Sequence, residues 1–212
     1  EQGLAWTVNA LAPGAIAQAL EPWGGRLLQV STDYVFGGAA SRPYLTDDRP
    51  DPLSAYGKSK LEGEIAAGPD AVVLRTSGIF SAHGRNFVTA MLDAMQNGGP
   101  LRVVADQITA PSHAAGVART AWALAQRGVP GIYHHRDAGQ ASWHQFAVAI
   151  GEAATALGML DRVPEILPVT SAEYGAAAQR PAFSVLDDSA TRAALQDSTA
   201  HWRETLEQML RE

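Results

Sequence analysis

Short apolar runs alternate with longer helical stretches along almost the whole chain. The runs that are typical of buried strands lie at 26–31, 71–77, 101–104, 131–135 and 166–169. The stretches typical of helices lie at 3–20, 54–67, 86–97, 113–127, 142–157, 187–195 and 199–211. Strands that alternate with helices in this way predict a parallel sheet covered by helices on both faces. The expected fold class is therefore α/β, with a doubly wound parallel sheet.

Turn and cap residues support these boundaries. Ser54 is a suitable N-cap for the helix predicted at 54–67. Gly98-Gly99-Pro100 should end the helix predicted at 86–97. Pro13 and Gly14 interrupt the first helical stretch. Because the elements after residue 98 are smaller, we expect 1–98 to carry much of the sheet. Residues 99–212 should mainly form a small C-terminal lobe that is interleaved with the sheet.

Composition excludes several classes of protein. The 212 residues are 46% hydrophobic and 18% charged, which is typical of a globular chain. A net charge of −6 argues against a nucleic-acid partner. The absence of cysteine excludes disulfide scaffolds, thiolate nucleophiles and cysteine-ligated zinc. No apolar run of about 18 residues and no signal peptide are visible, so we expect a cytoplasmic protein without membrane spans.

Tyr56 and Lys60 lie four residues apart at the start of a predicted helix, so they should project from one face. Thr32 follows the first predicted strand, at the edge where parallel sheets bind ligands. Together they would supply a hydroxyl, a phenol and an ammonium for the reduction of a carbonyl. A lysine one turn away favours the phenolate, and lowering its pKa by about 3 units takes roughly 4 kcal/mol. Thr32 would hold the carbonyl oxygen by a hydrogen bond.

Several blocks of sequence carry a family resemblance. The stretches "STDYVF", "AYGKSKLEGE" and "RTSGIF" resemble the extended short-chain dehydrogenase/reductases. A closer resemblance is to the dTDP-4-dehydrorhamnose reductase family, through "RPYLTDDRPDPLSAYGKSKLEGE", "GRNFVTAML", "DQITAPSH", "GIYHHRDAGQASWHQFA", "RPAFSVLD" and "HWRETLEQML". These blocks occur in order from end to end of the chain. The resemblance implies a partial Rossmann fold over 1–98 and a substrate-binding lobe over much of 99–212.

The same resemblance implies roles for individual residues. The catalytic residues would be Thr32, Tyr56 and Lys60. The residues expected to bind the cofactor are Ser31, Tyr56, Lys60, Thr76, Ser77 and Ile79. Those expected to contact the substrate are Thr32, Asp33, Tyr34, Asn86, Phe87 and Arg180. Arg180 suits a diphosphate because its planar fork pairs with phosphate oxygens, although it could equally cap a loop.

By resemblance, the reaction is the NADPH-dependent reduction of the 4-keto group of dTDP-4-dehydro-L-rhamnose, a step toward cell-surface polysaccharide. NADH is the alternative cofactor. A homodimer is an expected partner state, and the resemblance leaves a magnesium ion at a subunit contact open. However, no ligand cluster in the sequence supports a metal site.

Two departures from the family pattern leave alternatives open. Gly78 stands where the family commonly has a tryptophan, so a reductase or epimerase of another nucleotide-sugar remains an alternative. No G-x-x-G-x-x-G fingerprint occurs, and the chain begins at Glu1. We therefore expect it to be the C-terminal two-thirds of a reductase, preceded by roughly 60 to 80 residues. A non-catalytic binding or regulatory subunit is the remaining alternative.

Other polar and aromatic residues are expected to be structural. Asp47, Asp48 and Asp51 predict a solvated turn rather than a metal site. His134 and His135 are adjacent in a predicted strand and face opposite ways, so they cannot share one metal. We expect the tryptophans to pack in the core or the lobe: Trp6, Trp23, Trp122, Trp143 and Trp202.

Overall fold

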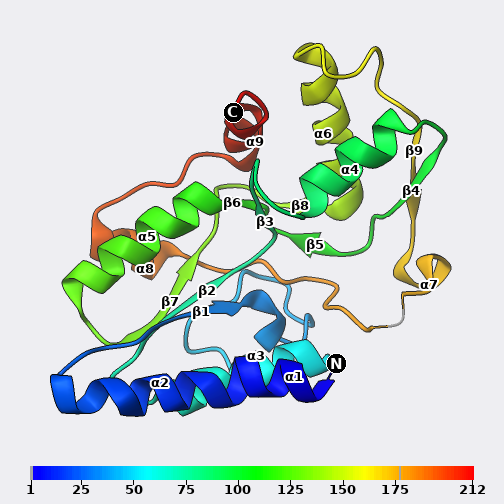
Figure 1. Ribbon diagram of the computed structural model, residues 1–212. Helices are drawn as coiled ribbons and strands as arrows, with labels where there is room; N and C mark the ends of the chain where they lie inside the picture. Colours follow the sequence, from blue (N-terminus) through cyan, green and yellow to red (C-terminus); the bar gives the residue numbers. More distant parts are fainter. Residues whose placement is uncertain (1, 177) are drawn as a thin grey trace.

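A three-stranded parallel sheet lies at the centre of the computed structural model, which describes residues 2–176 and 178–212 (Figure 1). Its strands are β1 (Leu28–Thr32), β2 (Val72–Thr76) and β7 (Gly131–His135), in the order β1-β2-β7. Thr32 pairs with Thr76, and Thr76 pairs with His135. The carboxyl ends of the three strands therefore meet at one edge, and the predicted α/β class is confirmed.

Helices cover both faces of this sheet. Arg75 of β2 points toward α3 (Ala55–Ala67), where it meets Glu64. The neighbouring side chain of Leu74 packs with Leu124 of α5 (Ala114–Arg127). Because alternate side chains of a strand point to opposite faces, α3 and α5 lie on opposite sides of β2. Helix α8 (Ser189–Leu195) lies beside β7 (Figure 1).

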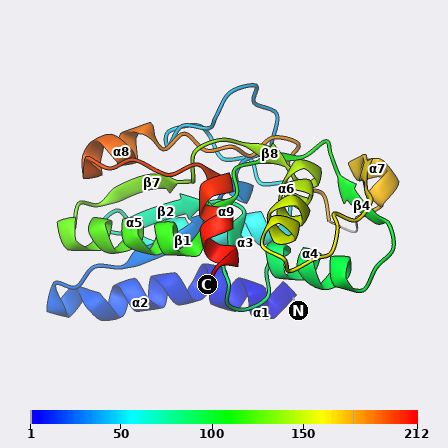
Figure 2. The same cartoon turned by 90° about the horizontal axis from the view of Figure 1, so that it is seen from above.

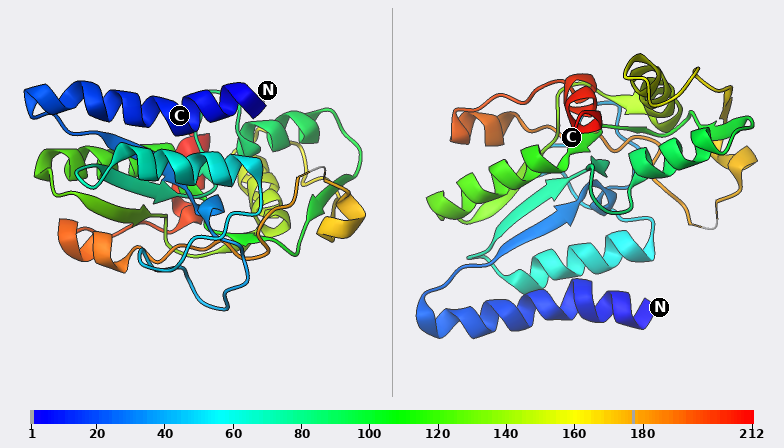
Figure 3. Two further views of the ribbon diagram at one scale, coloured as in Figure 1. Left: turned by 90° about the horizontal axis from the view of Figure 1, so that it is seen from below. Right: turned by 45° about the horizontal axis from the view of Figure 1, so that its top comes forward.

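The first helical stretch is α1 (Gln2–Trp6), η1 (Thr7–Leu11) and α2 (Ala12–Leu20), a nearly continuous run along the outer side of α3 (Figure 3). The η1 segment is a π-helix, in which the Ala12 N–H reaches back to the Thr7 carbonyl. Pro13 has no N–H to give to the carbonyl of Asn9, so the widened turn accommodates the interruption predicted there. The short 3-10 helix η2 (Glu21–Trp23) leads into β1.

Two glycines allow α3 to approach its neighbours closely. A Cβ on Gly63 would lie 1.9 Å from the carbonyl oxygen of Asn9 in η1. A Cβ on Gly57 would lie 2.2 Å from the carbonyl oxygen of Tyr34 in η3 (Asp33–Val35). Ser54 caps the helix, accepting a 3.1 Å hydrogen bond from the Gly57 N–H, as predicted. The start of α3 is thus fixed against the turn that follows β1.

A second group of elements forms the lobe, seen beside the sheet in Figure 2. Its helices are α4 (Phe87–Gln96), α6 (Trp143–Ala156), α7 (Ser171–Tyr174) and α9 (Trp202–Leu210). Its strands are β3 (Ile79–Phe80), β4 (Leu101–Val104), β5 (Ile108–Thr109), β6 (Ser112–His113), β8 (Ala141–Ser142) and β9 (Ile166–Val169). Phe80, Phe146 and Trp202 are central in its apolar core.

The order of elements fits the expected interleaving. Helix α4 belongs to the lobe core although it precedes residue 98, whereas α5 and β7 join the sheet although they follow it. The division at residue 98 stays a prediction about domains.

The prediction that all five tryptophans are packed inside is wrong for three of them. Trp6, Trp23 and Trp122 are 43%, 86% and 70% exposed, respectively, because they lie on the outer sides of their helices. Trp202 is buried, and Trp143 packs on Phe87 with ring centroids 4.7 Å apart.

Candidate active site

Thr32 is placed at the carboxyl edge of the sheet by its position as the last residue of β1. Its side chain is buried and caps the η3 turn, where Thr32 Oγ1 accepts a 3.2 Å hydrogen bond from the Tyr34 N–H. Thr32 Oγ1 also donates to Asp33 Oδ1 at 3.0 Å. The hydroxyl is therefore held in a fixed place at the end of the strand.

Tyr56 reaches this edge from the first turn of α3. Its ring meets the ring of Tyr34 edge-on, with centroids 6.3 Å apart, and the residue is 49% exposed. Partial burial raises the pKa of the Tyr56 hydroxyl, hydrogen bonding by Thr32 opposes this, and the charge of Asp33 raises it further. The structure therefore brings Thr32 and Tyr56 together, as the sequence predicted.

Lys60 lies one turn after Tyr56, and its Nζ donates a 2.6 Å hydrogen bond to the carbonyl oxygen of Val30. Burial lowers the pKa of Lys60, and the nearby charge of Glu64 opposes that shift. The expectation that Lys60 depresses the pKa of Tyr56 is not met in this state of the chain. The reason is that burial dominates the pKa of Tyr56, with a smaller contribution from Asp33, while the ammonium is engaged with Val30.

Asp33 is a buried carboxyl beside the reactive groups, only 3% exposed. Desolvation raises its pKa to about 7, although the nearby side chains of Ser184 and Thr32 lower it in part. Its Oδ2 atom has no hydrogen-bond partner within the described parts of the chain. A carboxyl in this setting changes charge near neutral pH.

Ser31 turns away from the expected cofactor side. Its Oγ donates to Glu64 Oε1, and Glu64 also accepts from Arg75, so the serine belongs to a buried polar network. Thr76 ends β2 beside Thr32, and its buried Oγ1 has no partner among the residues that the structure describes. Ser77 donates to the carbonyl oxygen of Ala110 at 2.9 Å. Thr76 is therefore the better placed of these three for a ligand.

The segment after β2 bends sharply at Gly78, where φ is +53°. A Cβ there would lie 3.1 Å from Pro111 Cα and 3.3 Å from the Ala110 carbonyl oxygen. Since side chains other than glycine's are strained at such a φ, this backbone favours glycine. Ile79 follows in β3 with an exposed side chain.

A cavity of about 140 Å³ lies in the lobe, lined by Phe87, Arg102, Trp143, Tyr174 and Arg180, among others. The charge of Arg180 lowers the pKa of Tyr34, although burial and Asp33 raise that pKa overall to about 12. Arg180 is therefore close enough to influence both the cavity and the edge of the sheet.

Asn86 is the N-cap residue of α4. Its Oδ1 accepts from the N–H groups of Val88 and Thr89 at 3.0 and 3.3 Å, and its Nδ2 donates to the Ser81 carbonyl oxygen at 2.7 Å. Little of its hydrogen-bonding capacity is left for a ligand. Phe87, the next residue, lines the cavity as expected.

The sequence reasoning missed several cavity residues. Arg102 and Tyr174 come from β4 and α7, which have no local motif, and Gln107 lies in the block "DQITAPSH", for which no site role was predicted. The signal that could have found them is chemical: aromatic and basic side chains cluster in a lobe already expected to bind substrate.

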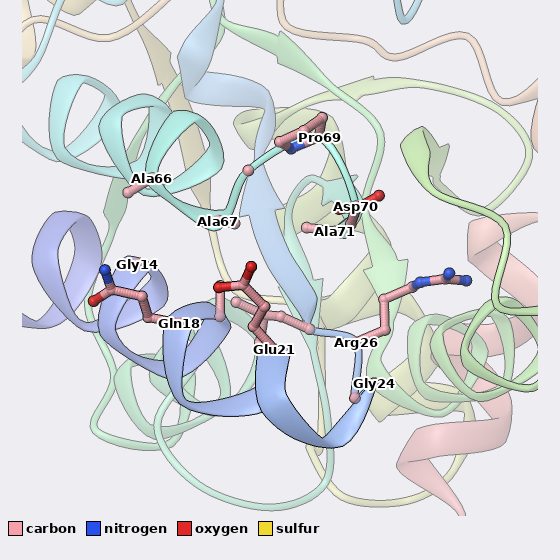
Figure 4. A pocket seen from close by; sticks show the side chains of 14 residues that line it. Gly14, Gln18, Glu21, Gly24, Arg26, Ala66, Ala67, Pro69, Asp70 and Ala71 are labelled. Carbon is pink, nitrogen blue, oxygen red and sulfur yellow. The ribbon is translucent and has the colours of Figure 1, made fainter.

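Another hollow, of about 620 Å³, lies at the opposite end of the sheet (Figure 4). Gln18, Glu21, Arg26 and Asp70 surround it, next to the amino ends of β1 and β2. None of the predicted site residues lines it. In residues 2–176 and 178–212 we find no group of three or more His, Asp or Glu that could hold a metal, and no helix long and apolar enough to cross a membrane.

Comparisons with known proteins show the family of this chain. The profile described as the RmlD substrate binding domain matches residues 1–212. A dTDP-4-dehydrorhamnose reductase of Aggregatibacter actinomycetemcomitans is 37% identical over 215 residues, covering 97% of this chain and 73% of that protein. The spore coat polysaccharide biosynthesis protein SpsK of Bacillus subtilis is 39% identical, covering 98% of this chain and 72% of that protein.

A solved structure is similar over nearly the whole chain. The dTDP-4-dehydrorhamnose reductase of Bacillus anthracis, in complex with NADP, superposes with a TM-score of 0.90 at 32% identity. The similarity covers 99% of this chain and 73% of that one. This chain belongs to the RmlD substrate binding domain family, whose members here include dTDP-4-dehydrorhamnose reductases.

Proposed function

We propose that this protein is an NADPH-dependent oxidoreductase that reduces the 4-keto group of dTDP-4-dehydro-L-rhamnose. The observation that carries the proposal is that Thr32 ends β1 while Tyr56 and Lys60 lie on the first turns of α3 beside that strand, with Tyr56 against Tyr34 and Lys60 against Val30. The names of the relatives, and the NADP in one of their structures, support the substrate and the cofactor.

Tyr56 is the proposed general acid. A ketone that receives a hydride becomes an alkoxide, which needs a proton at its oxygen. The raised pKa of Tyr56 keeps its hydroxyl protonated before the reaction, so it has a proton to donate. Thr32 would hold the same oxygen by a hydrogen bond, and Lys60 would stabilise the phenolate left behind.

The residues present fit the reactive end of the cofactor. The Thr76 hydroxyl, without a partner among the described residues, lies at the carboxyl end of β2, where parallel sheets bind nucleotides, and the Lys60 ammonium lies beside β1 at Val30. When bound, NADPH would supply the hydride. Lys60 would exchange its bond to Val30 for ribose hydroxyls, and Thr76 and Ile79 would border the ring. Ser31 has the weakest case among the proposed cofactor contacts, because its hydroxyl is bound to Glu64.

The lobe cavity is the proposed site for the nucleotide end of the substrate. Phe87 and Tyr174 offer aromatic surface to a base, and Arg180 and Arg102 offer charge to the diphosphate. The sugar would then extend toward Tyr34, which Arg180 influences. Asp33 and Tyr34 would flank the sugar, while Asn86 would act mainly by setting the start of α4 and the position of Phe87.

The test is NADPH oxidation by the full-length gene product in the presence of dTDP-4-dehydro-L-rhamnose. Tyr56→Phe should lower kcat by roughly 10²- to 10⁴-fold, because it removes the proton donor. Tyr133→Phe is the matched control: its hydroxyl donates to the Val129 carbonyl oxygen at the far end of the sheet. Turnover that is the same in Tyr56→Phe and wild type would exclude this mechanism.

The second candidate is a reductase or epimerase of another nucleotide-sugar, and Gly78 favours it because the resembling family commonly has a tryptophan at this position. A panel of dTDP-, UDP- and GDP-sugars would separate the two, since preference for a different sugar would replace the rhamnose assignment. Binding without any turnover would favour a regulatory subunit. The cytoplasmic location and the homodimer stay predictions; fractionation of cells and light scattering test them.

A further inference from the structure

The Thr32 hydroxyl has a single hydrogen and two lone pairs, and its surroundings compete for all of them. The Tyr34 N–H uses one lone pair at 3.2 Å. Asp33 Oδ1 lies 3.0 Å from Thr32 Oγ1, close enough to take the hydrogen. Tyr56 is the third neighbour, because the Thr32 side chain is close enough to oppose the rise in the pKa of its hydroxyl. A substrate carbonyl at this edge would be a fourth.

The charge of Asp33 decides this competition. An ionised carboxylate can only accept, so it takes the Thr32 hydrogen and leaves a lone pair of Oγ1 facing the site. That lone pair would repel the carbonyl oxygen of a substrate. A neutral carboxyl can donate instead. Its proton would then occupy the second lone pair of Thr32, and the Thr32 hydrogen would be free to point into the site.

The surroundings of Asp33 direct its proton to the side of Thr32. Asp33 is 3% exposed, and its Oδ2 atom has no hydrogen-bond partner within the described residues. Of the two carboxyl oxygens, Oδ1 is the one with a hydrogen-bond partner among the described residues, Thr32 Oγ1 at 3.0 Å, so a proton on Oδ1 is paired there. The neutral form of Asp33 is therefore the one that completes the hydrogen bonds of Thr32.

We propose that Asp33 is a positioning residue that sets the direction of the Thr32 hydroxyl, so that Thr32 donates to the substrate only while the Asp33 carboxyl is neutral. This inference rests on the proposed function. Asp33 need not touch the substrate for this, because it acts through Thr32. It adds a protonation-dependent control to the three residues already assigned.

The groups around Asp33 are consistent with a charge change near neutrality. Desolvation raises its pKa to about 7, while Ser184 and Thr32 favour the ionised form. Its titratable neighbours are the phenols of Tyr34 and Tyr56, whose pKa values are both raised. Both phenols thus stay neutral near pH 7. Arg180 is the charged group that acts on Tyr34 from the far side.

The experiment is the pH profile of kcat/KM for the full-length gene product, its Asp33→Asn variant and its Thr32→Val variant. For wild type we expect a decline above about pH 7, by up to roughly tenfold per pH unit, that levels off near the rate of Thr32→Val. In Asp33→Asn the amide cannot titrate, so the decline should vanish, whichever way the amide faces. Thr32→Val should also lack it.

A decline with an unchanged midpoint in Asp33→Asn or in Thr32→Val would overturn the proposal. A second measurement does not depend on turnover: ¹³C NMR of the aspartate carboxyl carbons, assigned by comparison with Asp33→Asn. We expect a midpoint near 7 for Asp33, and a midpoint near the ordinary value of about 4 would also overturn the proposal. If no nucleotide-sugar is reduced but this midpoint is near 7, the proposed function fails while the change of charge at Asp33 stands.

Discussion

Arg75 and Glu64 form a buried ion pair that joins the middle strand of the sheet to α3. Arg75 Nη2 lies 2.7 Å from Glu64 Oε2, and Arg75 Nε donates to Glu64 Oε1 at 3.0 Å. The hydroxyl of Ser31, the residue before Thr32, donates a further hydrogen bond to Glu64 Oε1. Since Glu64 follows Lys60 by one turn, this network fixes the helix that carries Tyr56 and Lys60 against the strands beside them.

Glu64→Gln should therefore destabilise the protein strongly. The variant leaves the Arg75 guanidinium buried without its counter-charge, and breaking a buried pair in this way costs about 3–5 kcal/mol. Urea denaturation at pH 7 measures the free energy of unfolding. The control is Glu62→Gln on the exposed side of the same helix, expected to change it by less than about 0.5 kcal/mol. Equal effects of the two substitutions would contradict the buried pair.

Gly57→Ala should lower both stability and turnover, although alanine is the better helix former. The added Cβ would lie 2.2 Å from the Tyr34 carbonyl oxygen, so α3 would have to move away from η3 and carry Tyr56 with it. We expect a cost of roughly 1–3 kcal/mol and a fall in kcat. Thermal unfolding and NADPH oxidation measure the two effects.

Gly3→Ala is the matched control, because an added Cβ at Gly3 in α1 meets nothing within 4 Å. Because alanine has a higher helix propensity than glycine, Gly3→Ala should leave the free energy of unfolding unchanged or raise it by up to about 1 kcal/mol. A Gly57→Ala variant that behaves like Gly3→Ala would show that α3 is not held as closely to Tyr34 as the structure has it.

The main elements could be predicted because their signals are local. The strand at 131–135 and the helix that begins after Ser54 match β7 and α3, since apolar periodicity and a capping serine act within a few residues. The short strands could not be predicted in this way. Strands β5 and β8 pair Ile108 with Ser142, and two-residue strands have no periodicity of their own.

The residues of the site also fall into those that the sequence could predict and those that it could not. Thr32 and Tyr56 could be predicted to meet, because the carboxyl ends of parallel strands and the following helices share one edge. The partner of Ser31 could not be, since Glu64 and Arg75 reach it only after α3 has packed on the sheet. The raised pKa of Tyr56 likewise depends on burial and on Asp33, which only the folded chain brings about.

Arg180→Gln should raise KM for the nucleotide-sugar with little change in kcat. The guanidinium is proposed to bind the diphosphate, which is remote from the reacting carbonyl, and such contacts are made equally in the ground and transition states. Loss of a charge-assisted pair predicts an increase of roughly tenfold or more. Steady-state kinetics with substrate varied measures it. Arg162→Gln, at an exposed position away from this cavity, should leave KM unchanged; a KM unaffected by Arg180→Gln would favour the loop-capping role.

His134 should make the protein sensitive to mild acid. It is fully buried, and burial together with the charge of Arg75 lowers its pKa from 6.5 to about 4. Between these two values the unfolded chain binds a proton that the folded chain does not bind. Stability contributed by neutral His134 is therefore present above about pH 6.5 and is lost as pH falls toward 4, by about 3 kcal/mol in total.

His134→Asn should remove this part of the pH dependence. An asparagine amide can replace the Nδ1–H that His134 shares with the Asp187 carbonyl oxygen at 3.0 Å, but it does not titrate. Urea denaturation at pH 7 and at pH 5 should show wild type losing about 2 kcal/mol more than the variant over that interval. His83→Asn in the exposed loop before α4 should behave as wild type does. If His134→Asn loses as much stability as wild type, the proton is taken up elsewhere in the chain.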